Sequence, residues 1–407
     1  MPSFWEALRY WWWLGCVGFG GPAGQVARMR EDLVDRRRWF SASEFDGALS
    51  FCTLLPGPEA QQLATYLGWR LHGIRGGLAA GLLFFLPGSA LLAGLTALIL
   101  AGSDSRAVLG ALAGLQSAVV ALVGLAWFRM ALRLPVHGRL LGLLWFAPLV
   151  VFRTAWIFPL VLAVAGTWGV LRPGETPPET PTAAARISSP GASVRTALVA
   201  LVAWWTPVVV VGLLLGREST PWRLGVFFSQ AALLTFGGAY AVLPFVGRHV
   251  VESAGWISPG ALLDAFALGE TTPGPLVLVL QHIGAVAGWN HPGTLPRPAA
   301  AALGGAVATW TTFAPSFLWI FTLGPHLARI LAQPRWKGAL AGLTPVVVAQ
   351  LGIFVGQLAV GVAVPSGRAE VFPGAVAGLS LVALATGRLP TWAVVLAAAG
   401  AGGIRAT

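Results

Sequence analysis

Charged side chains are scarce in this chain. They make up 10% of its 407 residues, whereas a typical soluble domain contains about 25%. Lys337 is the one lysine among the 26 basic residues, and only two cysteines occur. Neither the cysteines nor the histidines have a spacing that would hold a metal. The sequence therefore predicts no disulfide, no metal and no cofactor, and it lacks the nucleophile or metal cluster that an enzyme would need.

Long apolar runs stand where charge is missing. Hydrophobic residues make up 56% of the chain, and runs of about 20 apolar residues, enough to cross a bilayer, recur along it. They lie at residues 76–100, 107–130, 194–215, 301–323, and 371–385 and beyond. We therefore predict an all-α polytopic membrane protein.

The basic residues lie between these apolar runs. A net charge of +11 would suggest nucleic-acid binding in a soluble protein. Here the placement of the charge favours loops beside anionic lipid. We expect the lipid bilayer, and no nucleic acid, as a partner. The sequence leaves the oligomeric state open, with a homodimer among the options.

One motif occurs twice. Residues 19–58 contain FGGP, an arginine-rich segment, Trp39 and LLPGP, and residues 236–275 contain FGG, Trp256 and TTPGP. Subtracting 217 from each position in the second copy gives its match in the first. This constant spacing indicates an internal duplication. A segment rich in proline and threonine separates the copies, so we predict a first repeat at 1–172, a linker at 173–193 and a second repeat at 194–407.

The lengths around each Pro-Gly-Pro predict a hairpin that turns back inside the membrane. Two full crossings need about 40 residues, whereas residues 43–70 number 28. Arginines flank both ends of this segment, which places both ends on one side of the membrane. We predict a re-entrant helical hairpin in each half, broken at a Pro-Gly-Pro tip.

Basic loops in the first half match nearly neutral loops in the second. Five arginines lie in residues 28–38, whereas the matching segment 245–262 holds Arg248 alone. By the positive-inside rule, the two copies are inverted in the membrane. The hairpins would then enter from opposite faces and meet at mid-depth.

Each Pro-Gly-Pro begins a helix, whose free N–H groups and dipole favour an anion. Irregular backbone at membrane depth is tolerated where it lines a cavity or is buried in protein. We therefore predict an oxyanion site at the tips; the alternative is that the prolines only kink packed helices. The candidate substrate-binding residues are Gly20, Gly21, Pro56, Gly57, Pro58, Glu59, Gln62, Gly237, Gly238, Pro273, Gly274 and Pro275.

Two carboxylates flank the tips in apolar surroundings, where charge is expensive and usually functional. Glu59 follows the first Pro-Gly-Pro, and Glu270 lies shortly before the second. Both are candidate proton-coupling residues, and the alternative for Glu59 is a helix cap. Gln61, Gln62 and Gln281 offer amide donors near the tips, or hydrogen bonds between helices.

Several segments resemble the chromate ion transporter family in its long two-domain form. They are FGGPAGQVARM, LLPGPEAQQLATYLGW, LFFLPG and LLTFGGAYAVLPFV with TTPGP. The resemblance implies a protein of the bacterial cytoplasmic (inner) membrane that exports chromate and confers chromate resistance. It also implies sulfate, a dianion of similar shape, as a competitor or counter-substrate. From the residues, coupling to protons or to anion exchange is expected, and a secondary transporter or channel for another anion is the alternative.

Overall fold

The computed structural model describes residues 2–102, 105–152, 157–171, 190–236, 239–363, 371–387, 389 and 391–406. Every regular element in these ranges is a helix. Five helices are long and apolar enough to cross a membrane, which confirms the prediction of an all-α, multi-pass membrane protein. The expected linker at 173–193, apart from its last four residues, and the candidates Gly237 and Gly238 lie outside the described residues.

The first half contains eight helical elements among its described residues. They are α1 (Phe4–Val17), α2 (Gly21–Arg30), η1 (Glu31–Arg36), α3 (Ala42–Leu54), α4 (Glu59–Ala101), α5 (Arg106–Arg133), α6 (Val136–Val151) and α7 (Ile157–Leu171). The short η1 is a π-helix.

The second half begins with α8 (Pro190–Leu215), which has no counterpart in the first. The described elements that follow are α9 (Thr220–Leu233), α10 (Ala239–Arg248), η2 (His249–Ser253), α11 (Pro259–Thr271), η3 (Leu276–Leu278), α12 (Val279–Asn290), α13 (Arg297–Leu323), η4 (Gly324–His326), α14 (Leu327–Leu331), α15 (Pro334–Ala363), α16 (Val371–Thr386) and α17 (Thr391–Ala406). The bounds of α11 are those of α3 moved by 217 positions, and the π-helix η2 follows α10 as η1 follows α2.

The long helix α4 is two segments joined at a break. His72 and Gly73 have non-helical backbone angles, and Gly73 has a φ of 64°, which favours glycine. The first segment therefore ends about where the sequence predicted the hairpin to end. The second segment continues to Ala101 and is long enough to span a bilayer.

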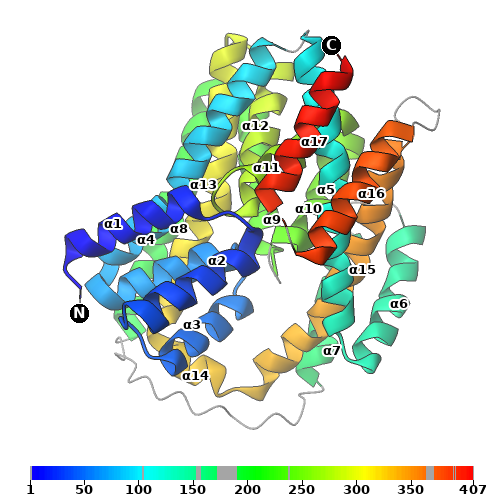
Figure 1. The fold of residues 1–407 in the computed structure, drawn as a ribbon. Coiled ribbons are helices and arrows are strands. Elements are labelled where there is room, and N and C mark those ends of the chain that lie inside the picture. Colours follow the sequence, from blue (N-terminus) through cyan, green and yellow to red (C-terminus); the bar gives the residue numbers. More distant parts are fainter. Residues whose placement is uncertain are drawn as a thin grey trace.

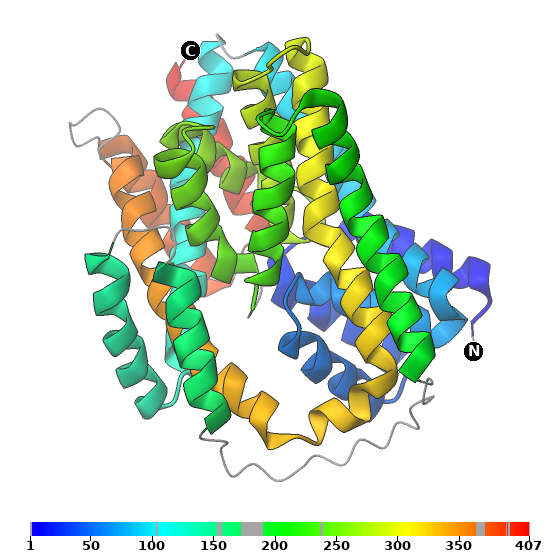
Figure 2. The ribbon, with the colours of Figure 1, turned by 180° about the vertical axis from the view of Figure 1, so that it is seen from behind.

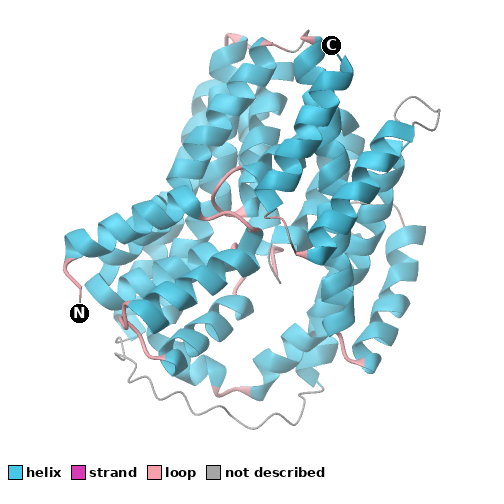
Figure 3. Cartoon of the chain, in the orientation of Figure 1, coloured by secondary structure: helices cyan, strands magenta, loops and turns pink. Residues whose placement is uncertain are grey.

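Matching helices of the two halves run in opposite directions. The second segment of α4 rises to the top of Figure 1, whereas α13 descends from the top to the lower edge. Seen from behind, α13 runs beside α8 over most of its length (Figure 2), and these two helices pack together. Loop segments also lie at mid-height of the bundle, away from its two ends (Figure 3).

Serine residues set the start of the matching helices α3 and α11. The Ser41 hydroxyl accepts a hydrogen bond from the Glu44 N–H at 3.2 Å, and the Glu44 carboxylate accepts one from the Ser41 N–H at 3.0 Å, which completes a capping box. Ser258 accepts from the Ala261 N–H at 3.1 Å. The same cap chemistry thus fixes both helix starts.

Most of the buried apolar side chains form two large clusters. One includes Tyr10, Trp11, Phe45 and Phe51 from α1 and α3. The other gathers residues of α5, α9, α11, α12 and α15. Each cluster also takes side chains from the opposite half, so the halves share their cores.

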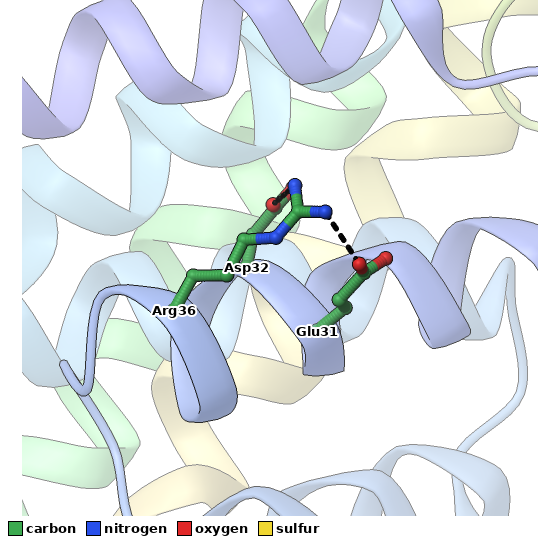
Figure 4. A network of polar contacts seen from close by, with 3 residues as sticks. All are labelled: Glu31, Asp32 and Arg36. Carbon is green, nitrogen blue, oxygen red and sulfur yellow. Dashed lines mark hydrogen bonds and ion pairs between the residues drawn. The ribbon is translucent and has the colours of Figure 1, made fainter.

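The arginine-rich segment packs on itself and on nearby aromatic rings. Arg36 in η1 donates to Glu31 at 2.6 Å and to Asp32 at 3.3 Å, as Figure 4 shows. Arg37 lies over the rings of Tyr10 and Trp39. Acidic and aromatic partners therefore hold part of this basic surface in a fixed arrangement.

Candidate functional site

The two Pro-Gly-Pro tips have similar backbones. Gly57 has a φ of 132° and Gly274 a φ of 106°, values that L side chains rarely adopt. Pro58 occupies the N-cap of α4 and Pro275 the N-cap of η3, which leads into α12. Each tip therefore begins a helix, as the sequence predicted.

Each tip is tied to the opposite half by a backbone hydrogen bond. The Gly57 N–H donates to the Thr235 carbonyl at 2.7 Å, and the Gly274 N–H donates to the Gly18 carbonyl at 3.1 Å. Thr235 and Gly18 are themselves matching positions, one residue before the FGG of each copy. The two bonds are thus equivalent and reciprocal.

Gln25 strengthens one of these two contacts. Its amide nitrogen donates to the Gly18 carbonyl at 2.8 Å and to the Gly274 carbonyl at 2.6 Å. Val242 stands at the matching position in the second half, so the first tip has no such amide clamp.

Both tips also lie against the two long helices α4 and α13. Gly88 on α4 faces the second tip so closely that an added Cβ would collide with the Pro273 carbonyl oxygen. Ser316 on α13 faces the first tip, with its hydroxyl 3.2 Å from where a Cβ on Gly57 would stand. Each residue directly follows a proline, Pro87 or Pro315, within its helix.

An aromatic pair joins these helices between the two contacts. Phe85 and Phe313 stack with ring centroids 4.1 Å apart and an interplanar angle of 4°. Each lies three residues before its contact residue, Gly88 or Ser316. The tips therefore pack around one shared aromatic contact.

The first tip carries buried polar side chains. The Gln62 amide nitrogen donates to the Pro56 carbonyl at 2.8 Å, which closes the turn. Gln61 is fully buried, and neither of its amide atoms has a hydrogen-bond partner. Glu59 is the first residue of α4, and because Pro58 holds the N-cap, the interpretation of Glu59 as the capping residue is wrong. In the first turn its charge still favours the helix dipole.

The second tip carries one buried carboxylate and its donor. Glu270 is 7% exposed, and the Tyr240 hydroxyl donates to it at 2.8 Å. The hydroxyls of Thr271 and Thr272 bond back to carbonyls of α11. Tyr240 was not predicted from the sequence, since the matching position in the first half is Ala23 and no motif distinguishes it.

The glycines after α1 form a turn beside the second tip. Gly20 and Gly21 have φ values of 95° and 68°, and Gly20 is the N-cap of α2. The carbonyl of their neighbour Gly18 accepts the hydrogen bond from the Gly274 N–H. The turn that Gly20 and Gly21 form therefore follows shortly after the residue that bonds the second tip.

Gln281 makes hydrogen bonds between helices, as one of its two interpretations predicted. Its amide oxygen accepts from the Ser89 hydroxyl at 2.7 Å and its nitrogen donates to the Ser89 carbonyl at 2.9 Å. Both residues line a cavity of about 700 Å³ between α4, α12 and α13, whose other walls are mostly apolar. Within the described residues, no group of three His, Cys, Asp or Glu side chains could hold a metal ion.

Known proteins resemble this chain along both halves. A family model described as chromate transporter matches residues 5–170 and 222–404. The chromate transport protein of Pseudomonas aeruginosa is 31% identical over 96% of this chain and 89% of its own length. Those of Synechococcus elongatus, named as probable, and Cupriavidus metallidurans are each 28% identical over 87% of this chain, and over 84% and 82% of their own lengths. No solved structure matches the chain.

Proposed function

Because the chain belongs to the chromate transporter family, we propose that it carries chromate across the bacterial inner membrane. The direction we propose is export, which would confer chromate resistance. The observation that carries the proposal is the match of the family model to both halves, which include both tips. Five membrane-length helices and curated chromate transport proteins that cover nearly the whole chain support it further.

We propose an architecture of two inverted repeats, at 1–172 and 194–407, joined by a linker at 173–193. The opposite directions of α4 and α13 support the inversion. The equivalent bonds of Gly57 and Gly274 to the opposite half support a two-fold relationship. In this arrangement α3 with the first segment of α4, and α11 with α12, are re-entrant hairpins whose tips lie at mid-depth.

The tips form the substrate site in this proposal. Each begins a helix whose first N–H groups are available to an oxyanion. The candidates Pro56, Gly57, Pro58, Glu59 and Gln62 belong to the first tip. Pro273, Gly274 and Pro275 belong to the second, with Gly20 and Gly21 shortly after the residue that bonds it. Gly237 and Gly238 stay candidates on the sequence alone, since they lie outside the described residues.

Glu270 and Glu59 supply proton coupling. An ionised carboxylate repels a nearby dianion, whereas a protonated carboxyl group does not. Proton uptake and anion binding therefore favour each other. Glu270 has a hydroxyl donor in Tyr240, which favours the ionised carboxylate and can relay a proton to it. Exchange against sulfate is the alternative source of driving force.

Chromate flux in inside-out membrane vesicles tests the proposal. An exporter should accumulate chromate in these vesicles at a rate that changes when an uncoupler removes the proton gradient, and sulfate in excess should slow the uptake. Vesicles without the protein are the control. No transport of chromate, sulfate, molybdate or phosphate at any pH from about 5 to 8 would contradict it; selective transport of another of these anions would reassign the substrate.

A further inference from the structure

We propose that the transported oxyanion is held at the first tip alone, by donors from both halves of the chain: the Gln61 and Gln62 amides and the Ser316 hydroxyl. The inference rests on the proposed transport function and assigns its binding residues. Ser316 belongs to α13, so the second half completes the site that the first half begins.

The geometry around Gly57 brings two of these donors together. A Cβ on Gly57 would stand 2.5 Å from the Gln62 amide nitrogen and 3.2 Å from the Ser316 hydroxyl oxygen. Both side chains are fully buried. Glycine at this position therefore leaves open the space into which both groups point.

These polar atoms lack the partners that buried polar atoms normally have. The Ser316 oxygen and the Gln62 amide oxygen have no hydrogen bond within the described part of the chain. Gln62 donates one amide hydrogen to the Pro56 carbonyl, and its second amide hydrogen is available to a ligand. An unpaired buried polar group costs about 1–3 kcal/mol. An oxyanion can accept from the Ser316 hydroxyl and from the second amide hydrogen of Gln62, and these free donors therefore indicate a ligand. The Gln62 amide oxygen is an acceptor and is not satisfied by the anion.

Ser316 differs from three other hydroxyls of its own helix, although Thr322 near the helix end is also unpaired among the described residues. Thr309, Thr311 and Thr312 on α13 each bond back to a carbonyl one turn earlier, at 2.7–2.8 Å. Ser316 makes no such bond. Its hydroxyl remains free to donate to a bound anion.

Gln61 points toward the same region. A Cβ on Gly81 would meet both the hydroxyl of Thr65, one turn further along α4, and the ring of Phe317 on α13, so Thr65 lies beside the seam between α4 and α13. Residues four apart share a helix face, so Gln61 faces this seam one turn closer to the tip. Both of its amide atoms are unpaired, whereas both amide atoms of Gln281 are bonded to Ser89.

The second tip has none of these donors. Leu278 and Val279 match Gln61 and Gln62, and Gly88 faces the second tip as Ser316 faces the first. A Cβ on Gly274 would meet the methyl group of Leu278 at 3.1 Å. An oxyanion beside Gly274 would meet the Leu278 methyl group, and the Tyr240 hydroxyl there already donates to Glu270. We therefore assign one binding site to the two tips.

The charge balance fits an anion held by neutral donors and a helix terminus. No arginine or lysine occurs in residues 40–69 or 298–328, which contain all three donors. The α4 N-terminus supplies a partial positive charge and free N–H groups. Glu59, in the same first turn, opposes the anion when ionised and permits it when protonated, which links this site to the proposed coupling.

Binding to the purified protein tests the inference. Sulfate and chromate are titrated against the wild type, Ser316→Ala and Gln61→Met, with Ser117→Ala as the matched control. Ser117 is fully buried, and its hydroxyl bonds back to the Ala113 carbonyl. We expect one anion per chain in the wild type. Each site variant should raise the Kd about tenfold, which corresponds to about 1.4 kcal/mol, and the control should leave it unchanged.

Thermal unfolding separates a binding role from a structural one. Among the residues that the structure describes, neither Ser316 nor Gln61 has a side-chain hydrogen bond to lose, so both variants should unfold without anion at the wild-type temperature. They should lose the upward shift that sulfate gives the wild type. Wild-type affinity in both variants, or two anions per chain, would overturn the inference and leave transport intact. A wild type that binds neither anion would instead count against the proposed function.

Discussion

The two tips share a backbone and differ in side chains. Both glycines have positive φ, and both N–H groups bond to matching carbonyls of the opposite half. The first tip then offers amides and a hydroxyl, whereas the second offers leucine, valine and the Glu270–Tyr240 pair. The comparison teaches that two tips of similar backbone can carry different side chains. In our proposal the first tip binds the anion and the second supplies a protonatable group.

The largest effect is expected where the frame is tightest, at the second tip. Gly88→Ala places a Cβ against the Pro273 carbonyl oxygen, a backbone atom that cannot rotate away. The tip must shift, and chromate transport should be lost while the protein still inserts. Gly94→Ala on the same helix, with no atom within 4 Å of the new Cβ, is the control. Transport by Gly88→Ala at the wild-type rate would show that this contact is not required.

Substituting the two tip glycines should separate their roles. Alanine at either position adds backbone strain of about 1–3 kcal/mol, so both variants should transport slowly. Gly57→Ala also fills the space beside Gln62 and Ser316 and should lose sulfate binding. Gly274→Ala meets only Leu278 at close range and should keep it.

Gly73→Ala is the control, because alanine there is also strained by a positive φ but its Cβ has no described atom within 4 Å. Its transport rate shows the effect of backbone strain alone. Equal sulfate affinity in the two tip variants would remove the distinction between the tips.

The carboxylate of the second tip should govern the response to pH. Glu270→Gln cannot change charge, so its chromate transport should lose its dependence on the proton gradient. The Tyr240 hydrogen bond favours the ionised form of the Glu270 carboxylate. Tyr240→Phe removes this bond, so the pH midpoint of transport should move upward by less than about one unit. Transport rates across about pH 5–8, with Glu59→Gln run in parallel, measure both effects. A Glu270→Gln protein with the wild-type pH profile would place the coupling elsewhere.

The smallest effect concerns the amide clamp on the second tip. Gln25→Val installs the residue type found at the matching position of the second half and removes two hydrogen bonds. The free energy of unfolding should fall by about 1–3 kcal/mol, seen as a lower Tm in detergent. Gln333→Val, at an exposed position, should leave the Tm unchanged. A Gln25→Val protein as stable as the wild type would mean that the backbone bond alone holds this tip.

Much of the frame was predictable because it depends on local chemistry. The Pro-Gly-Pro breaks end α3 and begin α4, and the segment 43–70 considered for the first hairpin begins within a residue of α3 and ends close to the break inside α4. The break at His72 and Gly73 followed from the length of the hairpin.

The contacts that complete the site were not predictable. Ser316 lies more than 250 residues from Gly57 in the chain, and nothing local marks it apart from the preceding proline. Subtracting 217 from its position gives Ile99 rather than Gly88, the residue that faces the other tip, so the repeat spacing does not reveal the pair. Tyr240 likewise reaches Glu270 only through packing. Long-range contacts of this kind depend on tertiary structure and leave no periodic signal.

Labelling of engineered cysteines from each side of the membrane tests the inverted arrangement most directly. In a protein whose Cys16 and Cys52 are replaced by serine, Ser105→Cys marks the turn after α4, and Gln333→Cys marks the turn before α15, shortly after α13; both positions are exposed. We predict that a membrane-impermeant thiol reagent labels position 105 only from outside the cell and position 333 only from the cytoplasmic side. Labelling of both positions from the same side would contradict the account.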